Sequence, residues 1–197
     1  MNYEIEPFEC PDSPRQEASF CSMVLWHKRY DLPHEDGNIK EPEDFEEVMT
    51  RYREEDGEEP FVLPVYMYDH SGVTINTTGF SCPWDSGQVG WIFARWPWVR
   101  NEFGEDVSFL DVRTRAYEVL KAEVEMYDMF LTGDVWEIVV YNDDGEPVDS
   151  MCDVWGHEYA ELEAERMLER CEKEAALERD LDEHARVTAV IAQNIGA

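Results

Sequence analysis

The sequence predicts an α+β protein with a mixed or antiparallel sheet, a long amphipathic helix packed on it and a charged C-terminal helix. Strand-period patterning fills residues 61–93, the least charged long run in a very acidic chain. Residues 109–132 repeat apolar side chains at helical spacing, and residues 135–155 have the pattern of two strands around a tight turn. Because strands precede and follow one amphipathic helix in the sequence, we expect a single sheet with that helix packed across it.

The first sixty residues predict two strands and a helix. Tyr3 and Ile5 alternate with acids in a short opening strand, and residues 20–27 are an apolar run typical of a buried strand. Residues 41–56 repeat apolar side chains every three or four positions, with acids near the positive end of the helix dipole. Gly57 ends this helix.

Three strands form the centre of the predicted sheet. Residues 61–68 are nearly all apolar or aromatic, which is typical of a strand covered on both faces. Residues 73–78 alternate after a turn, and residues 88–93 form the third strand. Gly90 inside that strand indicates a β-bulge or a close approach by another backbone.

The second half of the chain predicts two further helices and a hairpin. One helical turn at 97–103 precedes the helix of residues 109–132, which Ser108 caps. Strands at 135–141 and 147–155 add to the same sheet, and a charge-dense helix runs from His157 to Gly196. We therefore expect a core domain of residues 1–156 and a helical extension of residues 157–197.

Composition limits the classes of function. The chain has 197 residues, 43% of them hydrophobic and 13% aromatic, which is enough for a packed core. Its 46 acids against 16 bases give a net charge of −30, which repels phosphates and disfavours nucleic acid and anionic membranes as direct ligands. The same charge favours a partner with a basic groove. Solubility or a salt-loving host are the alternative explanations of the charge, but the excess of Glu over Asp and the five cysteines disfavour such a host.

The sequence also predicts a cytoplasmic location. The acidic N-terminus lacks the apolar segment of a signal peptide, and no apolar run reaches the length of a membrane span. Five irregularly spaced cysteines without a C-x-x-C pair are not typical of a disulfide framework. A reducing compartment is the simplest home for such a chain.

A Cys–His–carboxylate neighbourhood is the one candidate for catalysis. His70 lies in the turn after the first central strand, and Cys82 and Asp85 lie in the following loop. A thiol and an imidazole with an orienting carboxylate can form a nucleophile and its base. However, Pro83 lacks the N–H that would stabilise an oxyanion, and no feature favours a thiolate at Cys82. A structural role for this loop is therefore the preferred interpretation.

No cofactor or metal is expected. The five histidines are scattered, and neither an H-E-x-x-H sequence nor a calcium-binding loop occurs. The acids between residues 143 and 149 are interpreted as solvated charges of the hairpin.

Two kinds of surface are candidates for partner binding. Glutamates three or four positions apart on a helix lie about 5–6 Å apart, close to the spacing of phosphates along one nucleic-acid strand. Such a row could imitate nucleic acid, although an ordinary solvated helix face has the same pattern. An exposed tryptophan at position 84, 96 or 98 would instead mark a protein-binding hot spot. The candidate residues are Glu43, Glu46, Glu47, Trp84, Asp85, Glu161, Glu165 and Glu169.

Several segments resemble a family of small proteins carried by bacteriophages and plasmids. The segments YDHSG (68–72) and WDSGQVG (84–90) are the most specific, and MVLWHKRYDL, EVEMYDMFLTGDVWEIVV and VDSMCDVWG support them. The likeness extends to about Gly156 and leaves the C-terminal helix outside it. The family supplies no catalytic residues. The resemblance implies an accessory protein of a mobile element, a class that often acts against restriction enzymes or CRISPR systems in the host cytoplasm.

Three functions follow from these observations. The leading hypothesis is a non-enzymatic inhibitor whose acidic surface binds a host defence protein or ribonucleoprotein complex with a basic groove. The second is an enzyme that uses His70, Cys82 and Asp85. The third is a structural or regulatory phage protein that forms a homo-oligomer through its C-terminal helix.

Overall fold

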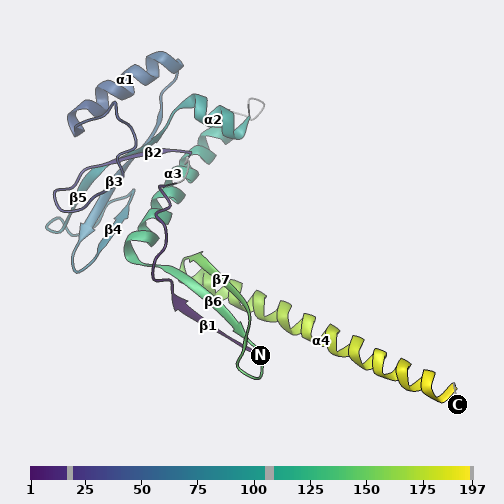
Figure 1. Cartoon of the computed structure of the whole chain (residues 1–197). Helices are drawn as coiled ribbons and strands as arrows, with labels where there is room; N and C mark the ends of the chain where they lie inside the picture. Colours follow the sequence, from purple (N-terminus) through teal and green to yellow (C-terminus); the bar gives the residue numbers. More distant parts are fainter. Residues whose placement is uncertain (17–19, 105–108, 196–197) are drawn as a thin grey trace. The chain divides into compact units, whose positions relative to one another are not determined.

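The computed structural model describes residues 1–16, 20–104 and 109–195, without the side chains of residues 109–110 and 189–195. Over these residues the chain has four α-helices and two antiparallel sheets, which confirms the predicted α+β class (Figure 1). The predicted cap Ser108 and the predicted helix end Gly196 lie outside the described residues. The chain divides into two compact units, residues 12–132 and residues 1–11 with 133–197.

The larger unit, residues 12–132, is built on a four-stranded antiparallel sheet of order β2-β5-β3-β4. Its strands are β2 (Ser22–Leu25), β3 (Phe61–Asp69), β4 (Val73–Asn76) and β5 (Ser86–Ala94). Its helices are α1 (Phe45–Asp56), which follows a 3₁₀ turn at Pro42–Asp44, α2 (Trp96–Phe103) and α3 (Phe109–Thr132).

Helices cover both faces of this sheet. Because successive side chains of a strand point to opposite faces, each strand can contribute to the core on either side. Met23 and Ile92 belong to the core that the sheet forms with α3, as predicted for the long helix. Their neighbours Val24 and Phe93 belong to a second core, formed with α1. Strand β3 contributes to both cores, so the predicted covering of both its faces is confirmed.

Arg15 connects the segment before β2 to α3. Its guanidinium contacts Glu35 and Glu123 and donates to the Cys21 carbonyl at 2.8 Å. Burial acts to lower the pKa of Arg15, but the two carboxylates outweigh it and the pKa is raised. Burial and the nearby Glu123 raise the pKa of the Cys21 thiol. The cluster is therefore a charged, hydrogen-bonded node beside a neutral thiol.

Gly90 lies where β2 and β5 approach most closely. It pairs with Leu25 on one side and Val65 on the other, next to a register shift between Val65 and Tyr66. A Cβ atom at this position would lie 2.0 Å from the Val24 carbonyl oxygen. The predicted bulge and close backbone approach are both confirmed.

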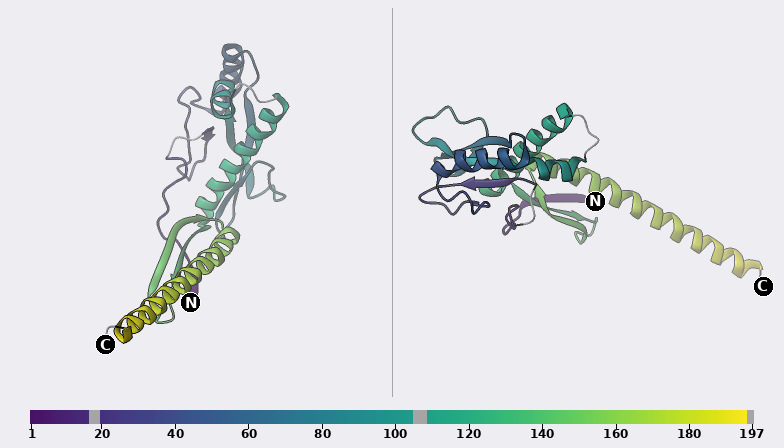
Figure 2. Two further views of the ribbon diagram at one scale, coloured as in Figure 1. Left: turned by 90° about the vertical axis from the view of Figure 1, so that its right-hand side faces the viewer. Right: turned by 90° about the horizontal axis from the view of Figure 1, so that it is seen from above.

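The smaller unit combines the two ends of the chain. A three-stranded antiparallel sheet has the order β1-β6-β7, from β1 (Asn2–Pro7), β6 (Val135–Tyr141) and β7 (Pro147–Trp155). Helix α4 (His157–Ile195) is continuous over its 39 residues (Figure 2). Its first half packs on the sheet through small or flexible side chains, Ala160, Ala164, Met167 and Cys171.

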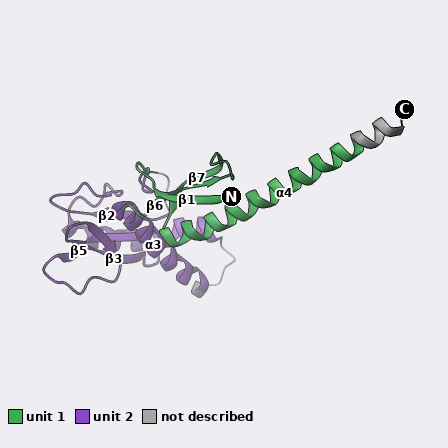
Figure 3. Cartoon of the chain, turned by 90° about the horizontal axis from the view of Figure 1, so that it is seen from below, with its two compact units in different colours: residues 1–11, 133–197 green, residues 12–132 purple. Residues whose placement is uncertain are grey.

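The expectation of one sheet was wrong. The hairpin of β6 and β7 does not join the central strands, because β6 pairs with β1 instead, with Ile5 opposite Ile138. The predicted turn at 97–103 is an eight-residue helix, α2, and β2 is shorter than the predicted 20–27. Helix α4 shares a compact unit with β1, β6 and β7 (Figure 3), and the domain division at residue 156 stays a prediction.

The close approach at Gly90 yields a stability test. Replacing Gly90 with Ala places a methyl group against the Val24 backbone, which cannot move without disturbing the sheet. We expect the free energy of unfolding to fall by at least about 2 kcal/mol, measured by urea denaturation. Gly87→Ala is the matched control in the same strand, because no atom lies within 4 Å of its added Cβ. Equal stabilities of the two variants would contradict this packing.

Candidate functional site

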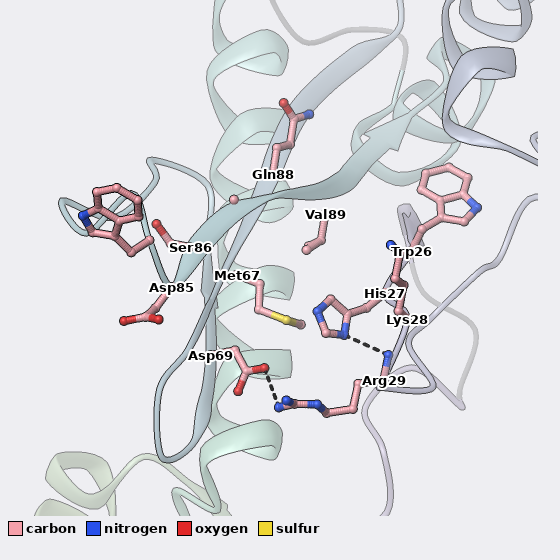
Figure 4. Close-up of a pocket in the computed structure, with 12 residues that line it drawn as sticks. Trp26, His27, Lys28, Arg29, Met67, Asp69, Asp85, Ser86, Gln88 and Val89 are labelled. Carbon is pink, nitrogen blue, oxygen red and sulfur yellow. Dashed lines mark hydrogen bonds and ion pairs between the residues drawn. The ribbon is translucent and has the colours of Figure 1, made fainter.

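One cleft of the larger unit gathers residues from three parts of its chain (Figure 4). It forms where β2 has ended and β5 continues, beside the end of β3. Its volume is about 610 Å³. It is lined by residues 26–29, Met67, Asp69 and residues 84–89. A second hollow of about 590 Å³ shares Trp26, His27 and Lys28 with it.

The charges of this cleft are balanced. Arg29 contacts Asp69 at 2.9 Å, and the Tyr30 hydroxyl donates to the other oxygen of that carboxylate at 2.9 Å. Lys28 and Asp85 add one charge of each sign. The cleft therefore differs from the strongly acidic remainder of the chain. The sequence does show Lys28-Arg29 as its one adjacent basic pair, but nothing local indicates that Arg29 reaches a residue forty positions away.

The structure brings together the residues of the catalytic hypothesis. His70 Nδ1 lies 3.3 Å from Asp85 Oδ2, and the Cys82 thiol donates to the same oxygen at 3.7 Å. The Asp69 backbone N–H donates to the Asp85 carbonyl at 2.9 Å, which joins the turn to the loop. Asp85 thus lies between the thiol and the imidazole.

This order does not suit nucleophilic catalysis. A catalytic thiol needs the imidazole beside it as base, with the carboxylate orienting the far side of the ring. Here the thiol neighbours an anion, which does not stabilise a thiolate. The contacts instead close the loop between β4 and β5, together with the Ser86 hydroxyl, which donates to the Cys82 carbonyl at 2.5 Å.

The three candidate tryptophans differ sharply in burial. Trp84 is 91% exposed, whereas Trp96 is 6% exposed and donates its indole N–H to the Glu59 carbonyl at 3.0 Å. Trp98 is half-buried and packs against Phe93, with ring centroids 6.0 Å apart. Trp84 is therefore the one of the three that meets the condition for a protein-binding hot spot.

The glutamates of α1 and its preceding turn fall into two groups. Glu55 and Asp56 contact Arg95, and Glu58 and Glu59 just beyond the helix contact other arginines. In contrast, the three predicted site residues at the start of the helix are exposed and have no ion-pair partner among the described residues: Glu43, Glu46 and Glu47.

The glutamates of α4 are exposed as well. Glu161 lies 3.7 Å from His157, and Glu169 lies 3.3 Å from Lys173, both one helical turn away. Glu165, between them, makes no ion pair within the described part of the chain. The glutamates of α1 and those of α4 belong to different compact units, so they form two separate candidate surfaces.

Two further results concern ligands and membranes. Among the described residues, no three His, Cys, Asp or Glu side chains are grouped so that they could hold a metal ion. No helix in the same residues combines the length and the apolar character needed to cross a membrane.

Comparison with known proteins adds no relative: no protein-family model, curated protein or solved structure matches the chain. The resemblance to phage and plasmid proteins stays a prediction.

The exposure of Trp84 predicts that this residue does not stabilise the fold. Trp84→Ala should change the free energy of unfolding by no more than about 0.5 kcal/mol, as is usual for surface positions. Trp96→Ala is the buried comparison, and it should cost about 3–5 kcal/mol. Both are measured by urea denaturation. A large loss of stability in Trp84→Ala would show that this side chain is part of the packing instead of a binding surface.

Proposed function

We propose that this chain is a non-enzymatic inhibitor encoded by a phage or another mobile element. Its target would be a host nucleic-acid-handling defence complex of the restriction or CRISPR type, and it would bind a basic groove of that complex. The observation that supports the proposal is the row of exposed, unpaired glutamates at the start of α1. No ion pair within the described residues engages these side chains, unlike the acids at the other end of α1, which contact arginines.

The spacing of the acids fits such a target. Glu161, Glu165 and Glu169 are four positions apart on α4, and one helical turn separates neighbours by about 5–6 Å, similar to the spacing of phosphates along a strand. Glu43 lies in the 3₁₀ turn before α1, and Glu46 and Glu47 lie in the first turn of α1. A groove whose lysines and arginines bind phosphates would meet carboxylates at a similar pitch.

The charge excess is distributed over both compact units. Residues 12–132 hold 25 acids against 11 bases, and the remaining residues hold 21 against 5. Each unit would therefore be attracted to a basic partner and repelled by nucleic acid. The inhibitor would compete with DNA or RNA for the target without binding either one.

Grouped charge reversal tests the proposal. A pull-down from host lysate with mass spectrometry first identifies the target. Replacing Glu43, Glu46 and Glu47 with Lys should then weaken binding at least about tenfold, because opposed charges at the interface become like charges. The same reversal at Glu161, Glu165 and Glu169 tests α4 separately. Reversal of Glu102, Glu118 and Glu125, exposed acids elsewhere in the chain, gives the same change in net charge and should matter less.

Salt and competition complete this test. Binding should weaken as salt rises, because screening acts on solvated charges, and added DNA or RNA should displace the protein. Binding that ignores salt and coexists with bound nucleic acid would contradict mimicry. The surface around Trp84 would then be the better candidate interface.

The contacts of Asp85 with both His70 and Cys82 give the enzyme hypothesis its own test. Because the carboxylate lies between thiol and imidazole, we expect Cys82→Ala to keep inhibition within about threefold, a change of less than 1 kcal/mol. Inhibition is assayed beside urea denaturation, since truncating a half-buried Cys can cost on the order of 1 kcal/mol. A loss of activity above tenfold in a folded variant would support catalysis, and His70→Ala should then show the same loss.

A further inference from the structure

Helix α4 has two halves with different surroundings. Up to Cys171 it packs on the three-stranded sheet. From Ala176 to Thr188 every residue is exposed. Figures 1 and 3 show the helix continuing beyond the strands of its own unit. The distal half therefore has no tertiary packing within the described residues of this unit.

A lone helix of this kind has little to stabilise it. Isolated helices shorter than about 12–15 residues are marginal in water, and most helices in proteins depend on packing of one face. Side-chain ion pairs could compensate, but within the described side chains of α4 the last is Lys173 with Glu169. Beyond it, Arg179 donates to the helix's own Ala175 carbonyl at 3.1 Å.

The distal half carries a stripe of two exposed leucines and two polar residues at coiled-coil spacing. Leu177, Leu181, His184 and Thr188 follow one another at intervals of four, three and four residues, and the sequence continues with isoleucines at 191 and 195. Leu177 is 61% exposed and Leu181 is 62% exposed. The Thr188 hydroxyl donates to the His184 carbonyl at 2.8 Å, which leaves its methyl group for packing.

We propose that the distal half of α4, from residue 173, pairs with the same segment of a second copy as a parallel, in-register two-stranded coiled coil. With Leu181 at heptad position a and Leu177 at d, Lys173 occupies a g position and Glu178 an e position. In this arrangement Lys173 of one copy faces Glu178 of the other, an attractive pair. Asp180, the next g residue, faces Ala185, so Glu174 at the preceding a position, which meets its own copy, is the one like-charge pair across this part of the seam.

The charge of the whole chain makes this association easy to distinguish from target binding. Two copies that each carry −30 repel each other, whereas burial of Leu177 and Leu181 in the seam is apolar and favours pairing. Added salt screens the repulsion, so self-association should tighten as salt rises. Inhibition of a basic target should weaken under the same change. Either proposal can therefore fail without the other.

Sedimentation equilibrium of the full chain at low and high salt tests the pairing. We expect a monomer–dimer equilibrium whose Kd falls at least threefold at high salt. The double substitution of Leu177 and Leu181 by Glu should weaken the dimer more than tenfold. Glu at Tyr159 and Leu162 is the matched control, because those exposed apolar residues lie off the stripe, and this variant should dimerise as the parent does. A monomer under all conditions, or a dimer indifferent to the leucine changes, would overturn the proposal.

Cross-linking tests the parallel register. In a chain with Cys10 and Cys152 replaced by Ser, since both are exposed, His184→Cys should form a disulfide between copies on mild oxidation. Leu177→Cys, made separately in the same background, should cross-link as well, because an antiparallel pair can place at most one of positions 177 and 184 opposite itself. A stable dimer that fails to cross-link at both positions would contradict the parallel, in-register arrangement.

Discussion

The scarcity of cations shapes this structure, since 16 lysines and arginines must serve 46 acids. Arginines are placed where separate elements of the larger unit meet. Arg15 joins the segment before β2 to α3, and Arg95, at the end of β5, contacts Asp56 at 2.5 Å and lies over the Tyr52 ring at 4.1 Å. A planar guanidinium suits this work because it binds carboxylates in a fixed geometry and stacks on rings. The acids at these junctions are ion-paired, whereas Glu43, Glu46 and Glu47 make no ion pair among the described residues.

The lack of an ion pair does not by itself show that an acid serves binding, because an unpaired acid can also stabilise the fold. Acids in the first turn of α1 stabilise the helix dipole, so Glu46 and Glu47 have a structural reason to be there. That reason requires neither three glutamates in the row nor the lack of an ion pair, since Arg51, one helical turn after Glu47, contacts Glu55 instead. By contrast, removing Arg15 would leave Glu35 and Glu123 facing each other without their cation, and carboxylates left so are strongly destabilising.

Local patterns predicted the elements, and long-range pairing decided what they form. Strand patterning placed β3, β4 and β5 to within two residues at each end. The close contact at Gly90 was predictable because a glycine inside a strand is visible in the sequence. The sheet that takes the hairpin was not predictable in this way. It depends on β1, over 130 positions away, and on Ala160 and Ala164, which are small enough for α4 to approach β6. The cleft was missed for the same reason, since the Arg29–Asp69 contact spans forty residues.

Self-association and target binding would act together in one particle. A dimer held by α4 carries every acidic surface twice, and a second contact made within one complex gains from effective concentration without any new interaction. The two steps respond to salt in opposite directions, because apolar pairing of like-charged chains needs screening and electrostatic docking is reduced by it. Inhibition by a dimer would thus weaken more gradually as salt increased than inhibition by a monomeric mimic. The shape of that dependence connects the exposed leucines of α4 to the glutamates of α1.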